Sequence, residues 1–185
     1  MLRLALMLFA ALGPVAAQAT TPDDTPPRVR FETTEGSFEV ALTSKAVPRA
    51  MENFLGLAEQ GDYDGTLIHR VVPGFLIQGG DPSGDGYGGE SLWGIPFARE
   101  IDPEASFAHA GVLAMAHRAD DQRNASQYFI TLAPAPWLDG RYTILGRVVD
   151  GMDVVEAIGK AAVVGPSQRP VVDIVVKSIR LVDPH

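Results

Sequence analysis

The feature that most restricts the fold of this chain is a series of short apolar runs separated by glycine, proline or charged residues. Residues 29–34 alternate apolar and polar side chains, Glu35-Gly36 follow, and residues 37–42 alternate again. Alternation on both sides of a glycine-containing turn is typical of a β-hairpin. Further strand-like runs cover residues 67–72, 75–78, 111–116, 128–132, 143–149 and 171–182. This pattern predicts a mainly β protein.

Two stretches have the period of a helix. The first follows Pro48, ends before Gly61 and places four apolar residues on one face: Met51, Phe54, Leu55 and Ala58. The second, residues 152–158, places Val154, Val155 and Ile158 on one face. Many short strands with two helices favour an antiparallel barrel or a sandwich, and the pattern does not separate the two. Because no repeat or internal linker interrupts it, we expect one domain over residues 29–185.

The first 19 residues are typical of a secretory signal peptide. Arg3 precedes an apolar run, Gly13-Pro14 breaks that run, and Ala17-Gln18-Ala19 provides small residues for cleavage after Ala19. A membrane anchor is the alternative, but the apolar stretch is shorter than the roughly 18 residues that span a bilayer. We therefore expect a periplasmic or secreted protein without a membrane partner. Residues 20–28 are rich in proline and aspartate and are expected to form a disordered lead.

Composition excludes several kinds of chemistry. The chain has no cysteine, so it has no disulfide, thiolate metal site or cysteine nucleophile. Its formal charge of −8 disfavours nucleic acid as a partner. The histidines lack the spacing of a zinc site, so we expect no metal and no cofactor. Residues 79–94 are glycine-rich and predict a long ordered loop. Its first half, 79–86, lacks the lysine of a phosphate-binding loop and is expected to be an acidic surface loop.

Three blocks combine strand-like apolar residues with a few polar or amphipathic groups: residues 66–81, 111–132 and 137–148. The groups that stand out are Arg70, Gln78, Gln127, Trp137 and Tyr142. In a small barrel they could line one apolar cleft, which is the usual form of a small-ligand or peptide site. Arg70 is flanked by apolar residues, and a buried guanidinium needs partners. Core packing is the alternative for the apolar members of the blocks, and for any single one it is the more common explanation: Phe75, Leu76, Phe129 and Leu138.

These blocks resemble those of the cyclophilins, the cyclosporin-binding class of peptidyl-prolyl cis–trans isomerases. The sequence HRVVPGFLIQGGD at 69–81 matches the most diagnostic motif of the family. SQYFI at 126–130 and WLDG at 137–140 match two further motifs in the same order. The resemblance extends over residues 29–182. It implies a closed eight-stranded antiparallel barrel capped by two α-helices, and with the signal peptide it suggests an exported bacterial member.

The resemblance also assigns roles to individual residues. Arg70 takes the position of the catalytic arginine, and four residues take positions of the proline pocket: Phe75, Leu76, Phe129 and Leu138. Gln78 takes the position that holds the substrate backbone and fixes the arginine. The remaining substrate-binding positions are Ala116 and His117 at the substrate backbone, Gln127, Trp137 at the cyclosporin position, Tyr142 where many relatives have histidine, and His69 before the arginine.

The implied activity needs no nucleophile and no proton relay. Amide resonance holds an X–Pro bond planar with a barrier of about 18–20 kcal/mol. Twisting the amide makes the prolyl nitrogen a better hydrogen-bond acceptor, so a guanidinium near it favours the twisted state. We expect the partners to be proline-containing peptides and unfolded proteins, with cyclosporin-like compounds as inhibitors, and we expect a monomer.

One loop and two other classes of function leave alternatives open. The loop at 117–125 (HRADDQRNA) is charged and lacks the glycine-containing pattern of the family, which leaves the preference for residues before proline undetermined. A proline-peptide binding module or holdase, in which turnover is incidental, would also use the apolar pocket. A small-ligand barrel without a peptide role would require the three ordered motifs to be a coincidence.

Overall fold

A computed structural model of the chain describes residues 26–117 and 121–182. The expected signal peptide lies outside these residues, as does most of the expected lead. Arg28, predicted to end that lead, is instead the first residue of a strand, because it pairs with Ala41 and Val182 on its two sides. In the described part of the chain, the main sheet has eight strands: β1 (Arg28–Thr33), β2 (Gly36–Ala41), β3 (Arg70–Val72), β4 (Leu76–Gly79), β6 (Val112–Met115), β8 (Tyr128–Thr131), β9 (Ile144–Asp150) and β12 (Val176–Val182).

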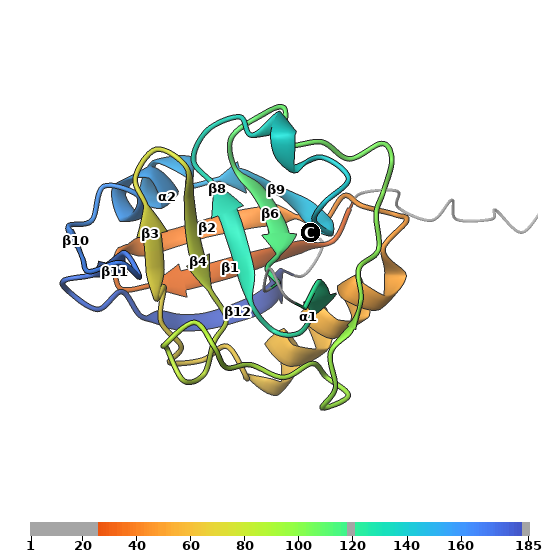
Figure 1. Cartoon of the computed structure of the whole chain (residues 1–185), viewed down its shortest axis with the longest axis horizontal. Coiled ribbons are helices and arrows are strands. Elements are labelled where there is room, and N and C mark those ends of the chain that lie inside the picture. Colours follow the sequence, from red (N-terminus) through yellow and green to blue (C-terminus); the bar gives the residue numbers. More distant parts are fainter. Residues whose placement is uncertain (1–25, 118–120, 183–185) are drawn as a thin grey trace, which may run out of the picture.

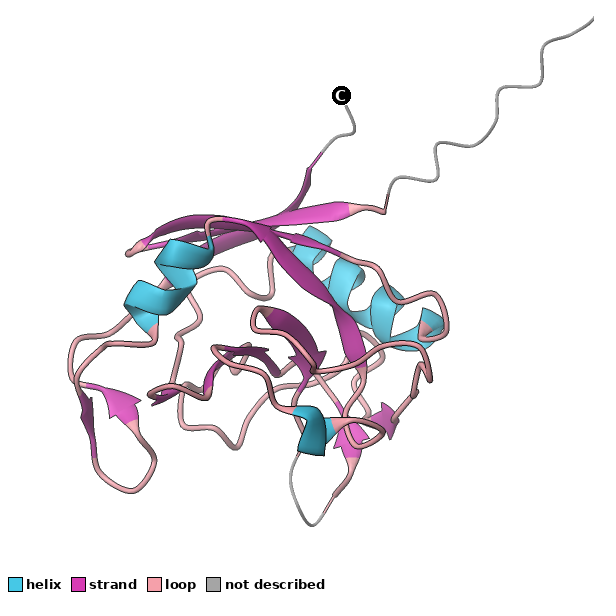
Figure 2. Cartoon of the chain, turned by 90° about the horizontal axis from the view of Figure 1, so that it is seen from above, coloured by secondary structure: helices cyan, strands magenta, loops and turns pink. Residues whose placement is uncertain are grey.

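The sheet curls into a barrel (Figures 1 and 2). Its strands pair antiparallel in the order β12-β1-β2-β9-β6-β8-β4-β3. The outer strands β12 and β3 are joined by the segments that precede them. Gly65 N–H donates to Val176 O at 2.8 Å, and Ile68 N–H donates to Ile174 O at 2.9 Å. These backbone hydrogen bonds connect the two edges of the sheet, so the fold is a barrel and not a sandwich.

The two expected α-helices, α1 (Pro48–Gln60) and α2 (Met152–Ile158), lie at opposite sides of the barrel (Figures 1 and 2). Pro48 opens α1 and Gly61, at φ 81°, ends it. The predicted buried face of α1 is only partly right, because Met51 and Leu55 are half-buried. The buried residues are Ala50, Asn53, Phe54, Leu57 and Ala58. The face is rotated because the Asn53 amide donates to Ala125 O and accepts from Leu92 N–H, both at 2.8 Å.

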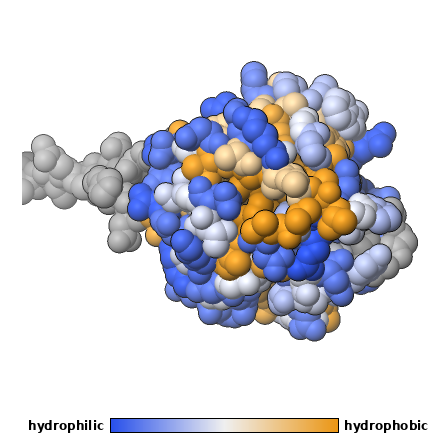
Figure 3. Space-filling model, turned by 90° about the vertical axis from the view of Figure 1, so that its left-hand side faces the viewer, coloured by the Kyte–Doolittle hydropathy of each residue, from blue (hydrophilic) through white to orange (hydrophobic). Residues whose placement is uncertain are grey.

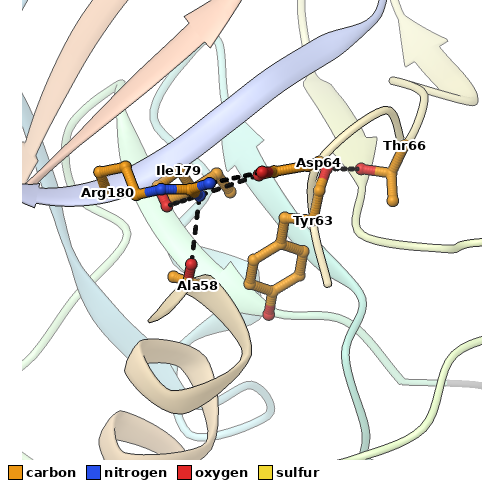
Figure 4. A network of polar contacts seen from close by, with 6 residues as sticks. All are labelled: Ala58, Tyr63, Asp64, Thr66, Ile179 and Arg180. Atoms are coloured by element: carbon orange, nitrogen blue, oxygen red, sulfur yellow. Dashed lines mark hydrogen bonds and ion pairs between the residues drawn. The ribbon is translucent and has the colours of Figure 1, made fainter. Parts of the chain in front are cut away.

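The end of α1 is joined to β12 through Arg180 (Figure 4). Its guanidinium donates to Ala58 O at 3.2 Å and forms an ion pair with Asp64. The hydrogen bond from Arg180 lowers the pKa of the Asp64 carboxyl. Close by, the Thr66 hydroxyl donates to Tyr63 O at 2.7 Å. Because exposed ion pairs contribute about 1 kcal/mol or less, this contact mainly directs the chain from α1 toward β3.

The main core fills the barrel between the sheet and the two helices. Its centre is a group of fully buried aromatic rings whose centroids lie 5.4–6.3 Å apart: Phe31, Phe54, Tyr63 and Tyr128. Edge-on and tilted pairs of this kind add to the free energy gained from burial alone. Burial also raises the pKa of the Tyr63 and Tyr128 hydroxyls.

Several short elements carry no clear signal in the sequence. They are β5 (Phe97–Ala98) paired with β7 (Arg123–Asn124), the 3-10 helix η1 (Pro136–Leu138), and β10 (Val163–Val164) paired with β11 (Arg169–Pro170). We call β10, β11 and the turn at 165–168 the ribbon.

The expected strand at 171–182 starts only at Val176. Residues 171–173 are exposed, and Val172 shows 76% of its surface. The face that carries the ribbon places apolar side chains at its centre (Figure 3). Among residues 26–117 and 121–182, no helix has the length and apolarity needed to cross a bilayer.

Candidate active site

Strand register places the candidate catalytic residues in one row. Arg70 on β3 pairs with Gln78 on β4, Gln78 pairs with Phe129 on β8, and Phe129 pairs with Ala114 on β6. Paired residues of adjacent strands point to the same face of a sheet. The neighbours Val71, Ile77, Ile130 and Leu113 point the other way and belong to the main core. The row therefore lies on the outer face of the barrel.

A second apolar cluster, separate from the main core, lies on this outer face. We call it the pocket cluster, and its buried members are Leu76, Phe107, Val112, Ala114, Ala116, Phe129, Ala135, Leu138 and Ile144. Phe75 and Tyr142 are half-buried against it. The four residues expected to grip a proline ring are thus brought together from β4, β8, η1 and the turn before β4. These residues pack with one another outside the main core, and their assignment to a proline pocket stays a prediction.

Aromatic contacts define the rim of the pocket cluster. Tyr142 meets Phe129 edge-on at 5.2 Å and stacks on His117 at 4.5 Å. The His117 ring also hydrogen bonds to Arg141 O at 3.2 Å between Nε2 and oxygen. Trp137 is 60% exposed and lies 5.9 Å from Phe75 between ring centroids. The rim therefore presents a ring that a ligand can cover.

A chain of amides runs from the arginine to the glycine-rich loop. Arg70 Nη1 donates to Gln78 Oε1 at 3.2 Å, and Gln78 Nε2 donates to Gln127 Oε1 at 2.9 Å. Gln127 Nε2 in turn donates to the carbonyls of Gly86 and Gly88 at 3.1 and 2.8 Å. Each acceptor along this chain is a neutral amide or carbonyl oxygen, so these hydrogen bonds orient Arg70 through uncharged groups.

A cleft of about 500 Å³ opens beside this chain of amides. It is lined by six of the expected site residues: His69, Arg70, Gln78, Ala116, His117 and Gln127. The rest of the lining comes from residues 85–89 and from Pro96, Asp121, Arg123, Ala125 and Ser167. Ala116 belongs both to the cleft and to the pocket cluster. The predicted residues therefore fall in two adjoining parts, the polar cleft and the apolar pocket cluster.

The glycine-rich loop is only partly the acidic surface loop expected from the sequence, since Asp85 is exposed but the Asp81 side chain is fully buried. Its carboxylate accepts hydrogen bonds from the Ser83 N–H and hydroxyl on one oxygen, and from Gly86 and Gly88 N–H on the other. Burial opposes ionisation of this group, but the hydrogen bonds outweigh it, so the pKa of Asp81 lies below its ordinary value. A buried anion organises the loop from inside.

His69 is buried next to this loop. Burial lowers the pKa of its imidazole, although the charge of Asp81 acts in the opposite direction. A Cβ at Gly86 would lie 3.6 Å from the His69 ring, which is an ordinary contact distance, so it is the φ of 86° that favours glycine where the loop crosses the ring. His69 therefore supports the wall of the cleft. Across the described ranges, no group of three or more acidic, histidine or cysteine side chains is placed to hold a metal ion.

Three residues of the site were missed by sequence reasoning. Phe107 stacks on Phe129 at 5.9 Å, and Asp139 holds Phe107 by accepting its N–H at 2.7 Å. Asp139 lies in the WLDG motif, which gave a signal for it, whereas Phe107 stands alone in an irregular segment. Gln168 accepts a hydrogen bond from Arg70 Nη2 at 3.5 Å. Its location in the turn of the ribbon gave no sequence signal.

Comparison with known proteins agrees with the geometry. A family model described as cyclophilin type peptidyl-prolyl cis-trans isomerase/CLD matches residues 28–181. The chain is 44% identical over 162 residues to the peptidyl-prolyl cis-trans isomerase CYP18-2 of Arabidopsis thaliana, covering 88% of this chain and 98% of that protein. It is 45% identical over 158 residues to peptidyl-prolyl cis-trans isomerase-like 1 of Mus musculus, covering 84% and 94%.

A solved structure shares the fold. It is the Cryptosporidium parvum cyclophilin type peptidyl-prolyl cis-trans isomerase determined in the presence of the dipeptide Ala-Pro, with a TM-score of 0.80 and 37% identity. The alignment covers 85% of this chain and 99% of that one. With its barrel, two helices and outer-face site, the chain belongs to the cyclophilin-type peptidyl-prolyl cis–trans isomerases and has their isomerase activity.

Proposed function

We propose that Arg70 is the catalytic group and that the protein accelerates rotation about X–Pro bonds in flexible segments of exported proteins. The observation that carries the assignment of Arg70 is its place in the row with Gln78 and Phe129, at the boundary between the polar cleft and the pocket cluster. A guanidinium at that boundary meets the amide that precedes a proline whose ring fills the pocket.

The mechanism follows from differential binding. The planar amide and the twisted amide present the same ring to the pocket, so the pocket holds both. Only the twisted amide offers a nitrogen lone pair, and the Arg70 N–H groups bind that state more strongly. Each 1.4 kcal/mol or so of preference speeds rotation about tenfold. The neutral partner Gln78 leaves the full positive charge of Arg70 available.

The proposed substrates are peptides with proline following a small residue. The Ala-Pro dipeptide used with the Cryptosporidium relative supports this choice. The pocket cluster provides an apolar site for the ring, and the cleft leaves room for the residues before proline. Arg123 and residues 85–89 line that part of the cleft, so we expect it to influence the preference for those residues.

The test is exchange spectroscopy by NMR on an Ala-Pro peptide with wild-type protein and Arg70→Ala. We expect the variant to lose most of the exchange while it still binds the peptide, because the pocket cluster is intact. Phe129→Ala is the matched variant and should weaken peptide binding itself. Wild-type exchange rates in Arg70→Ala would contradict the role of Arg70.

The same experiment separates an isomerase from a holdase. A binding module needs only the apolar pocket, whereas this site adds an arginine oriented by amides. If peptide affinity is high and wild-type exchange stays at the uncatalysed rate, the binding module is the correct description.

We further propose that the protein is an exported bacterial form, directed by residues 1–19. The charged, apolar and small-residue order of that segment supports this, and the family match begins only at residue 28. The relatives named above are from a plant, a mouse and Cryptosporidium parvum. Fractionation followed by N-terminal sequencing should find a mature chain that begins at Thr20 outside the cytoplasm. A chain that keeps residues 1–19 in the cytoplasm would contradict export.

Two expectations about partners stay with this proposal. We expect a monomer, and we expect cyclosporin-like compounds to compete with peptides because Trp137 is exposed at the rim of the pocket. Inhibition of peptide exchange by cyclosporin, compared between wild type and Trp137→Ala, tests the second expectation.

A further inference from the structure

The turn of the ribbon carries a backbone conformation that its sequence does not favour. Gln168 has φ 57°, and within the described residues it is the one non-glycine residue with a positive φ. Residues other than glycine and asparagine rarely adopt this left-handed conformation. Where one does, surrounding contacts hold it there. The contacts that hold Gln168 in this conformation are therefore expected to have a role.

Three contacts join this turn to the active site. Val71 N–H donates to Gln168 O at 2.9 Å, so the turn is attached to β3 beside Arg70. Arg70 Nη2 donates to Gln168 Oε1. The next residue, Arg169, donates through Nη1 to Gly84 O at 3.1 Å in the glycine-rich loop. Residues 168 and 169 thus bridge the arginine strand and the loop that forms the wall of the cleft.

The guanidinium of Arg70 is consequently contacted at both terminal nitrogens, Nη1 by Gln78 at 3.2 Å and Nη2 by Gln168 through a longer bond of 3.5 Å. One contact would leave the planar group free to turn about that contact, whereas two contacts fix its plane. Both acceptors are amide oxygens, so the plane is fixed without an anion that would weaken the field on a twisted amide. The two amides come from strands and turns 90 residues apart in the chain.

We infer that Gln168 is a positioning residue for isomerisation, which holds the guanidinium of Arg70 in the plane needed for the twisted amide. This inference rests on the proposed function of Arg70. Gln168 acts through Arg70 and not on the substrate, so its loss should lower kcat and leave KM nearly unchanged. The expected loss is about threefold to tenfold, the size of effect that one hydrogen bond supplies.

Two substitutions separate the side chain from the backbone. Gln168→Met keeps the length of the side chain and removes the acceptor. Gln168→Gly removes the side chain, and glycine adopts a positive φ without strain, so this variant should fold at least as well as the wild type. Both should lower kcat to a similar degree. Val164→Ala, an exposed site on the same ribbon, is the control and should leave kcat and KM at wild-type values.

The decisive measurement pairs steady-state kinetics with NMR of the Arg70 side chain. Rotation of the guanidinium about its Nε–Cζ bond should be slow in the wild type and faster in both Gln168 variants. Wild-type kcat in Gln168→Gly, a rise in KM alone, or unchanged guanidinium rotation would each overturn the inference. These failures differ from failure of the proposed function, in which the wild type itself would not exchange the peptide or Arg70→Ala would turn over normally.

Discussion

At the scale of single residues, the site depends on Arg70 and on the uncharged amide oxygens that accept its hydrogen bonds. Arg70 stands in an apolar run, and the sequence marks it as unusual for that reason. Its two amide acceptors come from Gln78, eight residues away, and from Gln168, 98 residues away. The first partner lies in the same motif, and the second becomes visible only when the ribbon is folded against β3.

His69 makes stability depend on pH. Burial lowers the pKa of its imidazole below the ordinary value of 6.5, so between the two values the unfolded chain binds the proton more readily. The free energy of unfolding should therefore fall as pH drops below about 6.5, by at most about 1.4 kcal/mol per pH unit for this one proton.

Urea unfolding of wild type and His69→Gln between pH 5 and pH 7.5 measures this slope, with the exposed His109→Gln as control. The His69 variant should lose part of the pH dependence. Equal slopes in wild type and His69→Gln would show that His69 is protonated as easily in the folded chain as in the unfolded one.

At the scale of elements, the glycine-rich loop is the part whose role changed most between sequence and structure. A run with three acidic or hydroxyl side chains among glycines is typical of a solvated loop. The structure turns Asp81 inward, where its two oxygens accept four hydrogen bonds from its own loop. The carbonyls of Gly86 and Gly88 then face Gln127, so the loop anchors the far end of the chain of amides that reaches Arg70.

Asp81→Asn should destabilise the protein by about 2–4 kcal/mol. An amide has one oxygen and one NH₂ group, so the NH₂ must face N–H or O–H donors whose hydrogen bonds the second carboxylate oxygen accepts in the wild type. Activity should fall as well, because Gly86 and Gly88 hold Gln127.

Asp85→Asn is the matched control for Asp81→Asn. Asp85 is exposed, and a single oxygen, Oδ1, accepts from Tyr87 N–H and shares the one proton of the Ser83 hydroxyl with Asp81, both at 2.8 Å. An asparagine oxygen can accept both bonds, so the cost should stay below about 1 kcal/mol. Urea unfolding measures both variants. Equal costs at positions 81 and 85 would contradict the account of the buried anion.

At the scale of the whole molecule, one sheet separates stability from activity. Its inner face packs the main core, and its outer face carries the pocket cluster and the row of Arg70, Gln78 and Phe129. Because side chains alternate along a strand, neighbouring residues serve different purposes. On β8, Ile130 is buried in the main core while Phe129 belongs to the pocket cluster.

This separation predicts that substitutions at two adjacent residues affect two different quantities, stability and activity. Ile130→Val should lower the free energy of unfolding by about 1 kcal/mol and leave kcat/KM unchanged. Phe129→Leu should lower kcat/KM about tenfold, since losing about 1.4 kcal/mol of contact with the proline ring has that effect. Unfolding curves and peptide exchange rates for the two variants measure both quantities. A tenfold loss of kcat/KM in Ile130→Val would show that the two faces are not independent.

The sequence alone determined the hairpin of β1 and β2, the limits of both helices, the positions of most strands and the three motifs of the site. These are local patterns, set by the period of apolar residues and by glycine and proline. The face of α1 that is buried, the inward turn of Asp81 and the partnership of Arg70 with Gln168 were decided only in three dimensions. The buried face of α1 and the partnership of Arg70 depend on which distant segment lies opposite, whereas Asp81 turns inward to donors of its own loop. Loop residues without periodicity carry no local record of either. Closure of the barrel between residues 65–68 and 174–176 is the same case, because backbone hydrogen bonds between distant segments leave no trace in side-chain patterning.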